Sequence, residues 1–181
     1  MKEEDKVILV TEQDDMVGIM DKMEAHKQGL LHRAFSIFIF NSKAEMLLQQ
    51  RAITKYHSGG LWTNACCSHP MPGEKTKDAA ARRLHEELGF DTPLEKIFDF
   101  VYKAEFDNGL TEYEFDHVFA GEYEGDVKIN TEEASEYCYK EIPEIKSMLQ
   151  THPKKFTAWF HLAFPKIEEW WTSRYQKIST E

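Results

Sequence analysis

The chain has 181 residues, of which 41% are apolar and 13% aromatic, enough for one domain over residues 1–181 and short for two. Its 22 basic and 32 acidic residues give a net charge of −10, so we expect no general attraction to nucleic acid or to an anionic membrane. No apolar run approaches the roughly 20 residues that span a bilayer, and the N-terminus is acidic where a secretory signal is basic. Three cysteines, an odd number, favour a cytoplasmic protein without a disulfide framework.

Apolar runs and turn residues outline the regular elements in chain order. The run AFSIFIF at residues 34–40 is typical of a buried strand, and residues 46–50 follow a polar turn as its hairpin partner. A helix is expected to start at Thr76 as N-cap and to end before Gly89 as C-cap. Strands are further expected at residues 61–67, 97–104 and 111–121, and helices at residues 143–150 and after Pro153. This order predicts a fold of the α/β (α+β) class, with a central mixed sheet flanked by helices.

The segment TNACCSHP, residues 63–70, holds the densest group of reactive side chains. In an extended chain the side chains alternate, so Cys67 and His69 share one face and Cys66 points to the other. This alternation selects Cys67 as the thiol beside a metal ligand. The alternative is that both cysteines are small buried hydrophobic residues of the core.

Carboxylates and histidines form a second group. In a strand, Glu112, Glu114 and Asp116 lie on one face, where their mutual repulsion is costly unless a cation compensates it. The alternative is an edge strand whose acidic face lies in water. The histidines that join them in a set suited to zinc, manganese or magnesium are His26, His32 and His69. One histidine alone more often packs or caps, so the metal hypothesis depends on their convergence in the fold.

The helix and its approach have the spacing of a Nudix box. With residues 86–89 as EELG, the matching positions are Glu74, Arg82, Leu84, Glu86, Glu87, Gly89 and Phe90. Ser68 replaces the first glycine, and Arg83 replaces a glutamate of the group that holds the hydrolytic magnesium. An ordinary amphipathic helix reproduces two or three such matches by chance, but hardly this number. Glu86 and Glu87 remain suited to a hard cation.

Scattered basic residues form the last group. They are Lys22, Arg51, Lys55 and Arg83. In an acidic protein most lysines and arginines only solvate the surface. Together with a metal, however, these four would form a cradle for a diphosphate.

With these residues in view, the chain resembles the type I isopentenyl diphosphate isomerases, a branch of the Nudix superfamily. The resemblance runs from about residue 22 to residue 160 and rests on the stretches LHRAFS, MLLQQR, LWTNACCSHP, RRLHEELG, YKAEFDNGLTEYEFDHVF and FTAWF. It implies a Nudix-like sandwich, a small isoprenoid diphosphate as substrate, and no nucleic-acid or membrane partner. The resemblance does not predict the oligomeric state.

The resemblance also implies roles for individual residues. Cys67 matches the catalytic thiol, Glu114 the catalytic carboxylate, and Tyr102 the tyrosine that hydrogen-bonds it. The ligands of one tight divalent metal site (Mn, Zn or Mg) are implied to be His26, His32, His69, Glu112 and Glu114. Glu87, a backbone carbonyl at the cysteine and the substrate diphosphate are implied to hold Mg²⁺. The diphosphate clamp is implied to be Lys22, Arg51, Lys55 and Arg83, with Trp159 over the hydrocarbon end.

Two rival functions use the same residues. A Nudix-type diphosphate hydrolase would share the fold and one metal site, but Arg83, Ser68 and the cysteine with its histidines argue against it. A metal-stabilised binding module would use Cys67 and the carboxylates only as ligands, and it predicts metal-dependent folding without turnover.

Overall fold

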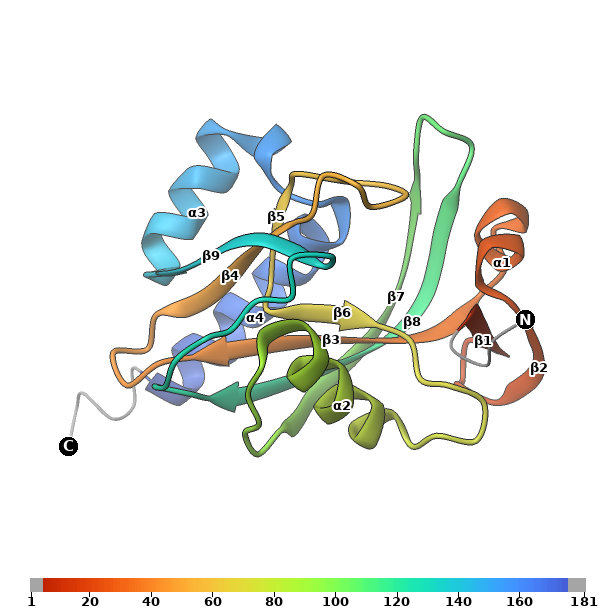
Figure 1. The fold of residues 1–181 in the computed structure, drawn as a ribbon, viewed down its shortest axis with the longest axis horizontal. Coiled ribbons are helices and arrows are strands. Elements are labelled where there is room, and N and C mark those ends of the chain that lie inside the picture. The colour runs from red at the N-terminus through yellow and green to blue at the C-terminus, as the bar shows by residue number, and fades with distance from the viewer. Residues whose placement is uncertain (1–4, 176–181) are drawn as a thin grey trace.

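The computed structural model describes residues 5–175 and shows a mixed sheet with helices on both of its faces (Figure 1). The elements in chain order are β1 (Lys6–Val10), β2 (Met16–Asp21), α1 (Lys22–Gln28), β3 (His32–Phe40), β4 (Met46–Arg51), β5 (Trp62–Thr63), β6 (Cys66–Ser68), α2 (Thr76–Leu88), β7 (Glu95–Glu105), β8 (Thr111–Glu122), β9 (Ala134–Lys140), α3 (Ile142–Thr151), a short 3₁₀ turn (Pro153–Lys155) and α4 (Ala158–Tyr175). Within the described residues, none of the helices is long and apolar enough to cross a membrane.

The centre of the sheet is β3. Along its whole length it pairs in parallel with β8, in a register that sets His32 against Glu114, and β8 pairs on its other side with the antiparallel β7. The other edge of β3 is shared: β1 pairs with its start, β6 with its middle and β4 with its end, all antiparallel. The short strand β6 thereby lies beside the middle of β3.

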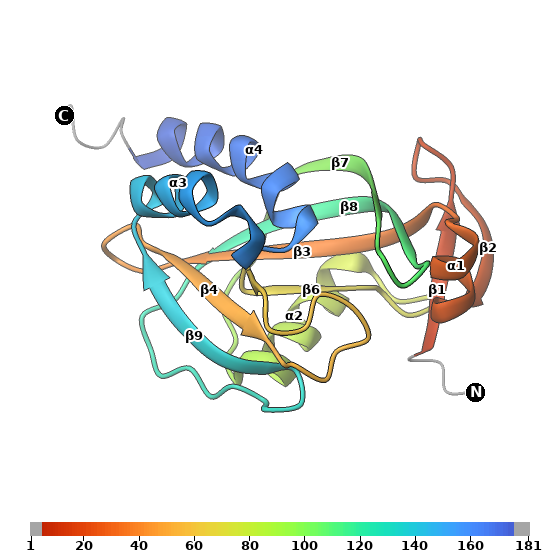
Figure 2. The ribbon, with the colours of Figure 1, turned by 90° about the horizontal axis from the view of Figure 1, so that it is seen from above.

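Alternate side chains of β3 enter two separate cores. Phe35 and Ile37 pack against α2, through residues such as Leu84, whereas Phe38 and Phe40 pack against α3 and α4. Figure 2 shows α2 on one side of the sheet and α3 with α4 on the other. Since β3 is buried on both faces, it reads as a continuous apolar run rather than as an alternation. The predicted class, a mixed sheet flanked by helices, is confirmed.

Local departures from the sequence expectations have simple causes. The helix expected from Thr76 is present, but Lys75 occupies the N-cap without a side-chain hydrogen bond, so the assignment of Thr76 as N-cap is wrong by one position. Gly89 is the C-cap and has φ 72°, as expected. The strand expected at residues 61–67 is divided into β5 and β6, because the buried Asn64 bonds the backbone carbonyls of Ile37 and Cys66.

Candidate active site and metal centre

The two reactive motifs meet on the α4 side of the sheet. The register pairs Cys67 of β6 with Ser36 of β3, and Glu114 of β8 with His32 of β3. Cys66 points to the opposite face and is fully buried in the α2 core, so the predicted alternation of the two cysteines is confirmed. The strand with the three acids is an interior strand and its acids are buried, so the alternative of a solvated edge strand is wrong.

Histidines from three parts of the chain converge beside these acids. His26 comes from α1, His32 from the start of β3 and His69 from the loop after β6, and with Glu114 they form a group of donor atoms within 4.8 Å of one another. The Nδ1–H of His26 donates to the carbonyl of Lys22 at 2.6 Å, and that of His32 to the carbonyl of Leu30 at 2.8 Å. A backbone carbonyl only accepts, so in both rings the Nε2 lone pair is left free.

The carboxylates are held by Tyr102 and by histidines. The Tyr102 hydroxyl lies 2.6 Å from Glu114 Oε2 and 3.1 Å from Glu112 Oε2. The other oxygen of Glu114 lies 3.0 Å from His69 Nε2 and 3.5 Å from His32 Nε2. Burial alone would raise the pKa of Glu114, but His32 and His69 beside it hold that pKa well below its ordinary value. Burial, and then the neighbouring Glu114, raise the pKa of Glu112.

A histidine that was not selected from the sequence lies beside this centre. His57 lies on the loop between β4 and β5, is 6% exposed, and has its Nε2 atom 3.0 Å from Glu112 Oε1. It forms a second group of donors with His26 and Glu112. The only signal for it in the sequence is a histidine between a tyrosine and the turn Ser58-Gly59-Gly60, and nothing local shows that this loop folds over the sheet.

The donor set fits a divalent cation. Three buried imidazole nitrogens have no hydrogen-bond partner within residues 5–175, namely Nε2 of His26, His32 and His57, and two buried carboxylates lie beside them. Unpaired imidazole lone pairs next to buried acids are costly without an ion, and imidazole with carboxylate is the donor chemistry of zinc and manganese. Four of the five predicted metal ligands, His26, His32, His69 and Glu114, therefore lie in one group, and Glu112 lies in a second group that shares His26.

The thiol of Cys67 lies in a hydrogen-bond network of its own. Its sulfur is 3.1 Å from Asn64 Oδ1 and 3.4 Å from the hydroxyl of Ser36, which in turn donates to Asp116 Oδ2 at 2.7 Å. Burial, and then the charge of Asp116, raise the pKa of Cys67 far above its ordinary value. The thiol thus keeps its proton at neutral pH. The sequence analysis did not assign Ser36 or Asn64 to the site, because their contacts connect segments far apart in the chain.

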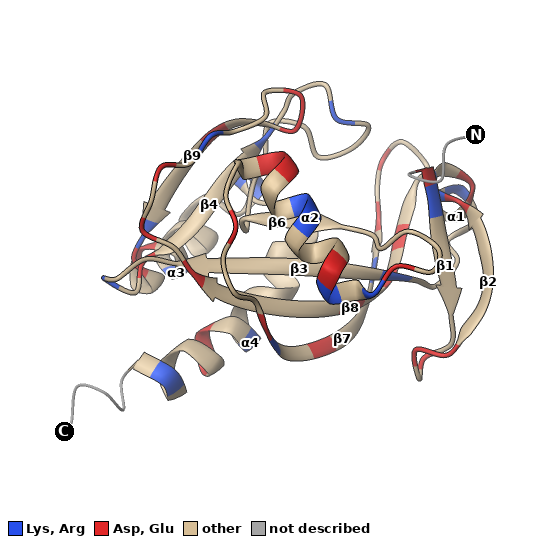
Figure 3. Cartoon of the chain, turned by 60° about the horizontal axis from the view of Figure 1, so that its bottom comes forward, with Lys and Arg blue, Asp and Glu red and all other residues tan. Residues whose placement is uncertain are grey.

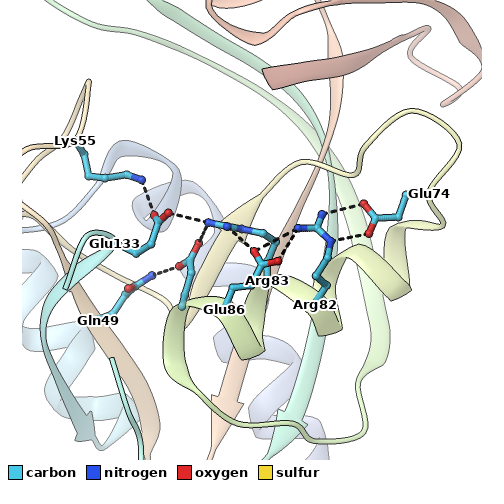
Figure 4. Close-up of polar contacts among 8 residues, drawn as sticks. Gln49, Lys55, Glu74, Arg82, Arg83, Glu86 and Glu133 are labelled. Carbon is cyan, nitrogen blue, oxygen red and sulfur yellow. Dashed lines mark hydrogen bonds and ion pairs between the residues drawn. The ribbon is translucent and has the colours of Figure 1, made fainter. Parts of the chain in front are cut away.

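The four predicted clamp cations line one pocket of about 360 Å³, together with Cys67 and Glu87. Two of the four are paired with acids within it: Lys55 Nζ lies 2.6 Å from Glu133 Oε2, and Arg83 Nη2 lies 2.7 Å from Glu87 and 3.1 Å from Glu133 (Figure 4). Figure 3 shows both signs of charge along α2. Glu133 comes from the segment before β9 and was not among the site residues expected from the sequence.

Glu87 lines this pocket although its side chain is buried. It is 4% exposed, and its Oε2 accepts a hydrogen bond from Gln49 at 3.1 Å. Burial raises the pKa of Glu87, and the charge of Arg83 opposes that rise. One side of α2 therefore presents a buried carboxylate to the same pocket as the clamp cations, which suits a magnesium bound together with a diphosphate.

A second, small cavity of about 30 Å³ continues from the thiol into the protein. Cys67, Tyr102, Glu114 and Trp159 all line it. Trp159 is 3% exposed at the start of α4, and the Arg51 guanidinium lies 5.1 Å from the centre of its ring. The cavity is thus bounded by the thiol, the metal-centre carboxylates and an indole, and Arg51 lines both this cavity and the larger pocket.

The similarity of this chain to known proteins points to one family. A model of the NUDIX domain matches residues 30–160. The isopentenyl-diphosphate Delta-isomerase of Pectobacterium atrosepticum is 50% identical over 166 residues, which cover 92% of this chain and 93% of that protein. The isopentenyl-diphosphate Delta-isomerase 2 of Aromatoleum aromaticum is 48% identical over 91% of this chain and 87% of that protein.

Solved structures support the fold at lower identity. DR0079 of Deinococcus radiodurans superposes with a TM-score of 0.68 at 16% identity, covering 81% of this chain and 90% of that one. The MutT protein of Methanosarcina mazei gives a TM-score of 0.64 at 23% identity, covering 77% of this chain and 94% of that one. At these identities the likeness concerns the fold alone.

Proposed function

The chain belongs to the Nudix family and, within it, to the isopentenyl-diphosphate Delta-isomerases, and from this membership we propose that it interconverts isopentenyl and dimethylallyl diphosphate. The observation that carries the proposal is one cavity lined by the thiol of Cys67, the carboxylate of Glu114 and the indole of Trp159. Hydrolysis of a diphosphate has no need of that combination.

The reaction defines what the site has to supply. A proton is added to the terminal alkene carbon and another is removed from the allylic carbon, so one C–H bond forms, one breaks and the double bond moves by one position. A positively charged tertiary centre develops between the two steps. The site must therefore supply two proton-transfer groups, an aromatic face that stabilises positive charge and a pocket that excludes water.

Cys67 and Glu114 are the two proton-transfer groups in this proposal. Ser36 and Asn64 orient the Cys67 sulfur, and Tyr102 fixes Glu114 through the 2.6 Å hydrogen bond to its Oε2. The carboxylate of Glu114 is buried and bonded by a hydroxyl, and the half-buried thiol of Cys67 lines the pocket, so both groups can hold and transfer protons at the substrate. Catalysis of each transfer by a positioned group is worth about 10²–10⁴ in rate.

The metal centre has a supporting role. His26, His32, His69, Glu112 and Glu114 would hold a divalent ion, whose positive charge would keep the carboxylates in place and lower their proton affinity. Manganese, zinc and magnesium are the ions that suit such donors. The chain's own contribution is geometric, because the carbonyls of Lys22 and Leu30 fix the orientation of two of the imidazole rings.

The clamp cations bind the diphosphate end in the larger pocket. Lys22, Arg51, Lys55 and Arg83 line this pocket, and Glu87 would hold a Mg²⁺ ion whose charge would neutralise the remaining phosphate charge. Two of the four cations are paired with Glu133, so substrate binding exchanges a carboxylate for a phosphate rather than filling an empty basic pocket. The arginine geometry suits bidentate contact with phosphate oxygens.

Trp159 stabilises the charged centre at the other end. Its buried indole borders the cavity that also contains Cys67 and Glu114, and a cation over an indole in a dry site gains about 2 kcal/mol. The same burial excludes water, which would otherwise trap the cation as an alcohol.

The test is a product assay. Purified, metal-loaded protein is incubated with isopentenyl diphosphate, and dimethylallyl diphosphate and released phosphate are measured in parallel. Dimethylallyl diphosphate without phosphate release supports the proposal. Phosphate release from nucleoside diphosphate derivatives would favour a hydrolase, and metal-dependent folding with no turnover of either substrate would favour a binding module.

A further inference from the structure

We propose that Gln49 is a positioning residue for the cation at Glu87: its Nε2–H holds the carboxylate of Glu87, and its Oε1 accepts a hydrogen bond from a water molecule of the bound ion. This inference rests on the proposed function, because it accepts that a divalent cation binds at Glu87 together with the diphosphate. It goes beyond that function by giving a role to a residue of β4 that was not among the expected site residues.

The position of Gln49 is fixed by the sheet. It pairs with Thr63 of β5 on one side of β4 and with Tyr137 of β9 on the other. Leu47, two positions earlier, belongs to the core against α2, so the alternation along the strand turns Gln49 towards the same helix. Gln49 is 3% exposed and lines the pocket of the clamp cations. The fold therefore buries an amide at a position where an apolar side chain would continue the core.

The nitrogen end of this amide holds Glu87. Gln49 Nε2 lies 3.1 Å from Glu87 Oε2, and Arg83 Nη2 lies 2.7 Å from the other carboxylate oxygen (Figure 4). The arginine favours the ionised carboxylate, which only accepts hydrogen bonds, so the amide turns its nitrogen towards Glu87 and its oxygen away. Donors from β4 and α2 thus fix the plane of the carboxylate and leave further lone pairs for a cation.

The oxygen end of the amide has no donor among residues 5–175. Gln49 Oε1 is buried and unpartnered, and so are the Nε–H groups of Arg51 and Arg83, whose side chains line the same pocket. The two arginine groups are donors, which suit phosphate oxygens. The glutamine oxygen is an acceptor, which a phosphate would repel, and a buried acceptor without a donor costs free energy. Gln49 Oε1 therefore marks the part of the pocket that suits a cation with its water rather than the diphosphate.

A hydrated magnesium ion has donors of the required kind. Mg²⁺ gives up its water ligands reluctantly, and it is usually bound by one or two carboxylates, by substrate phosphates and by several waters. The charge of the ion polarises these waters, so their protons are strong hydrogen-bond donors. Residues that orient a metal-bound carboxylate in this way typically change the metal affinity by about 10–100-fold when they are replaced. The affinity for the cation is therefore the quantity that should depend on Gln49.

Electron paramagnetic resonance measures this affinity, with Mn²⁺ in place of Mg²⁺ at the oxygen ligands. The protein is loaded with one equivalent of Zn²⁺ for the histidine centre and saturated with dimethylallyl diphosphate, and the signal of free Mn²⁺ is compared with a blank without protein. We expect Gln49→Met, which has a similar length but no amide, to raise the Mn²⁺ Kd about tenfold or more. Gln49→Glu places a second carboxylate beside Glu87, so it should bind Mn²⁺ more tightly than the native chain.

Gln50→Met is the matched control. Gln50 is the next residue of β4 and lies on its other face, where its amide donates to the carbonyl of Gly60 and accepts from the hydroxyl of Ser135. Its Mn²⁺ affinity should equal that of the native chain. If Gln49 only tied β4 to α2, both of its variants would lower Tm and leave the Mn²⁺ affinity unchanged, and that result would overturn the proposed role.

The outcomes also separate this inference from the proposed function. If the native chain isomerised its substrate without binding Mn²⁺ beyond the histidine centre, the cation at Glu87 would be wrong, and the role of Gln49 with it. If Gln49→Met weakened Mn²⁺ binding but the native chain showed no isomerisation, the proposed reaction would fail and the role of Gln49 would stand. If Gln49→Met did not fold, Gln49→Glu would decide, because unchanged or weaker Mn²⁺ binding in that variant contradicts the role.

Discussion

Arg83 Nη2 lies 2.7 Å from Glu87 Oε1, so the arginine that replaces a Nudix acid is bonded to the acid one turn further along α2. The same guanidinium reaches Glu86 at 2.7 Å and Glu133 at 3.1 Å. Arg83 therefore sits among three carboxylates in the pocket that also contains the other clamp cations. Without substrate, the charge of Arg83 neutralises these acids. When substrate is bound, the same charge is available to a phosphate group.

Replacing this arginine with an acid should weaken substrate binding. In Arg83→Glu a fourth carboxylate joins Glu86, Glu87 and Glu133, and repulsion replaces attraction at the diphosphate. We expect kcat/KM for isopentenyl diphosphate to fall on the order of 100-fold, or about 2.7 kcal/mol, without hydrolase activity appearing. Steady-state kinetics with parallel phosphate detection measures both effects.

Arg83→Lys is the matched control for charge. It keeps the positive charge and loses the bidentate geometry, so its loss should be smaller than that of Arg83→Glu. Unaltered kinetics in Arg83→Glu would show that this side chain makes no contact with the substrate.

The adjacent cysteines should respond in opposite ways to substitution. Cys67→Ala removes a proton-transfer group and should lower kcat by about 10³ or more with little change in Tm. Cys66→Ala removes a buried core atom on the other face and should cost about 1 kcal/mol of stability while activity is kept. Kinetics and thermal melts of both variants decide, and the reverse pattern would contradict the assigned roles.

Ser36→Ala tests the network behind the thiol. The variant leaves the buried Asp116 without its hydroxyl donor and should cost about 1–3 kcal/mol at neutral pH. Burial already raises the pKa of Asp116 above 3.8, and loss of the hydrogen bond to the carboxylate raises it further. When a carboxyl group has a higher pKa in the folded than in the unfolded protein, the free energy of unfolding falls as the pH rises above the pKa of the unfolded state. The stability that Ser36→Ala loses should therefore be larger at pH 7 than at about pH 4.

Urea melts of the native chain and of Ser36→Ala at the two pH values measure this difference. Ser135→Ala is a suitable control, because that exposed hydroxyl bonds Gln50 far from the thiol. An equal loss at both pH values would mean that Asp116 does not ionise in the folded protein.

Removing the metal should destabilise the protein. Without an ion, the buried carboxylates of Glu112 and Glu114 repel each other, and the folded state loses the binding free energy of the ion. We expect a chelator to lower Tm by several degrees and added Mn²⁺ to restore it. His69→Gln and Glu112→Gln should bind less metal, as measured by elemental analysis, whereas the exposed Glu136→Gln should bind as much as the native chain.

The central strands and the reactive faces were predictable because they are local patterns. The alternation in residues 66–69 and 112–116 places Cys67 and the acids on their correct faces, and the apolar run at residues 34–40 marks the central strand. The spacing of the helix at residues 76–88 likewise places Arg83 and Glu87 in the pocket.

What the sequence did not reveal depends on contacts between distant segments. Glu133 precedes β9, a strand whose pairing with β4 was not anticipated, and it reaches Lys55 and Arg83 only because the two strands are adjacent. His57 lies beside Glu112 because its loop is held by the β7–β8 hairpin, through Phe106 and through a hydrogen bond from Asn108 to the carbonyl of Tyr56. No pattern in the neighbouring sequence predicts either contact.

Isomerisation in heavy water tests the proposed reaction most directly. The protein is incubated with isopentenyl diphosphate in D₂O, and the product is analysed by NMR for the position of deuterium. If Cys67 and Glu114 add and remove protons as proposed, deuterium from the solvent should appear in a methyl group of dimethylallyl diphosphate, and Cys67→Ala should abolish that incorporation. Absence of both deuterium exchange and product with the metal-loaded native chain would contradict the proposed isomerase.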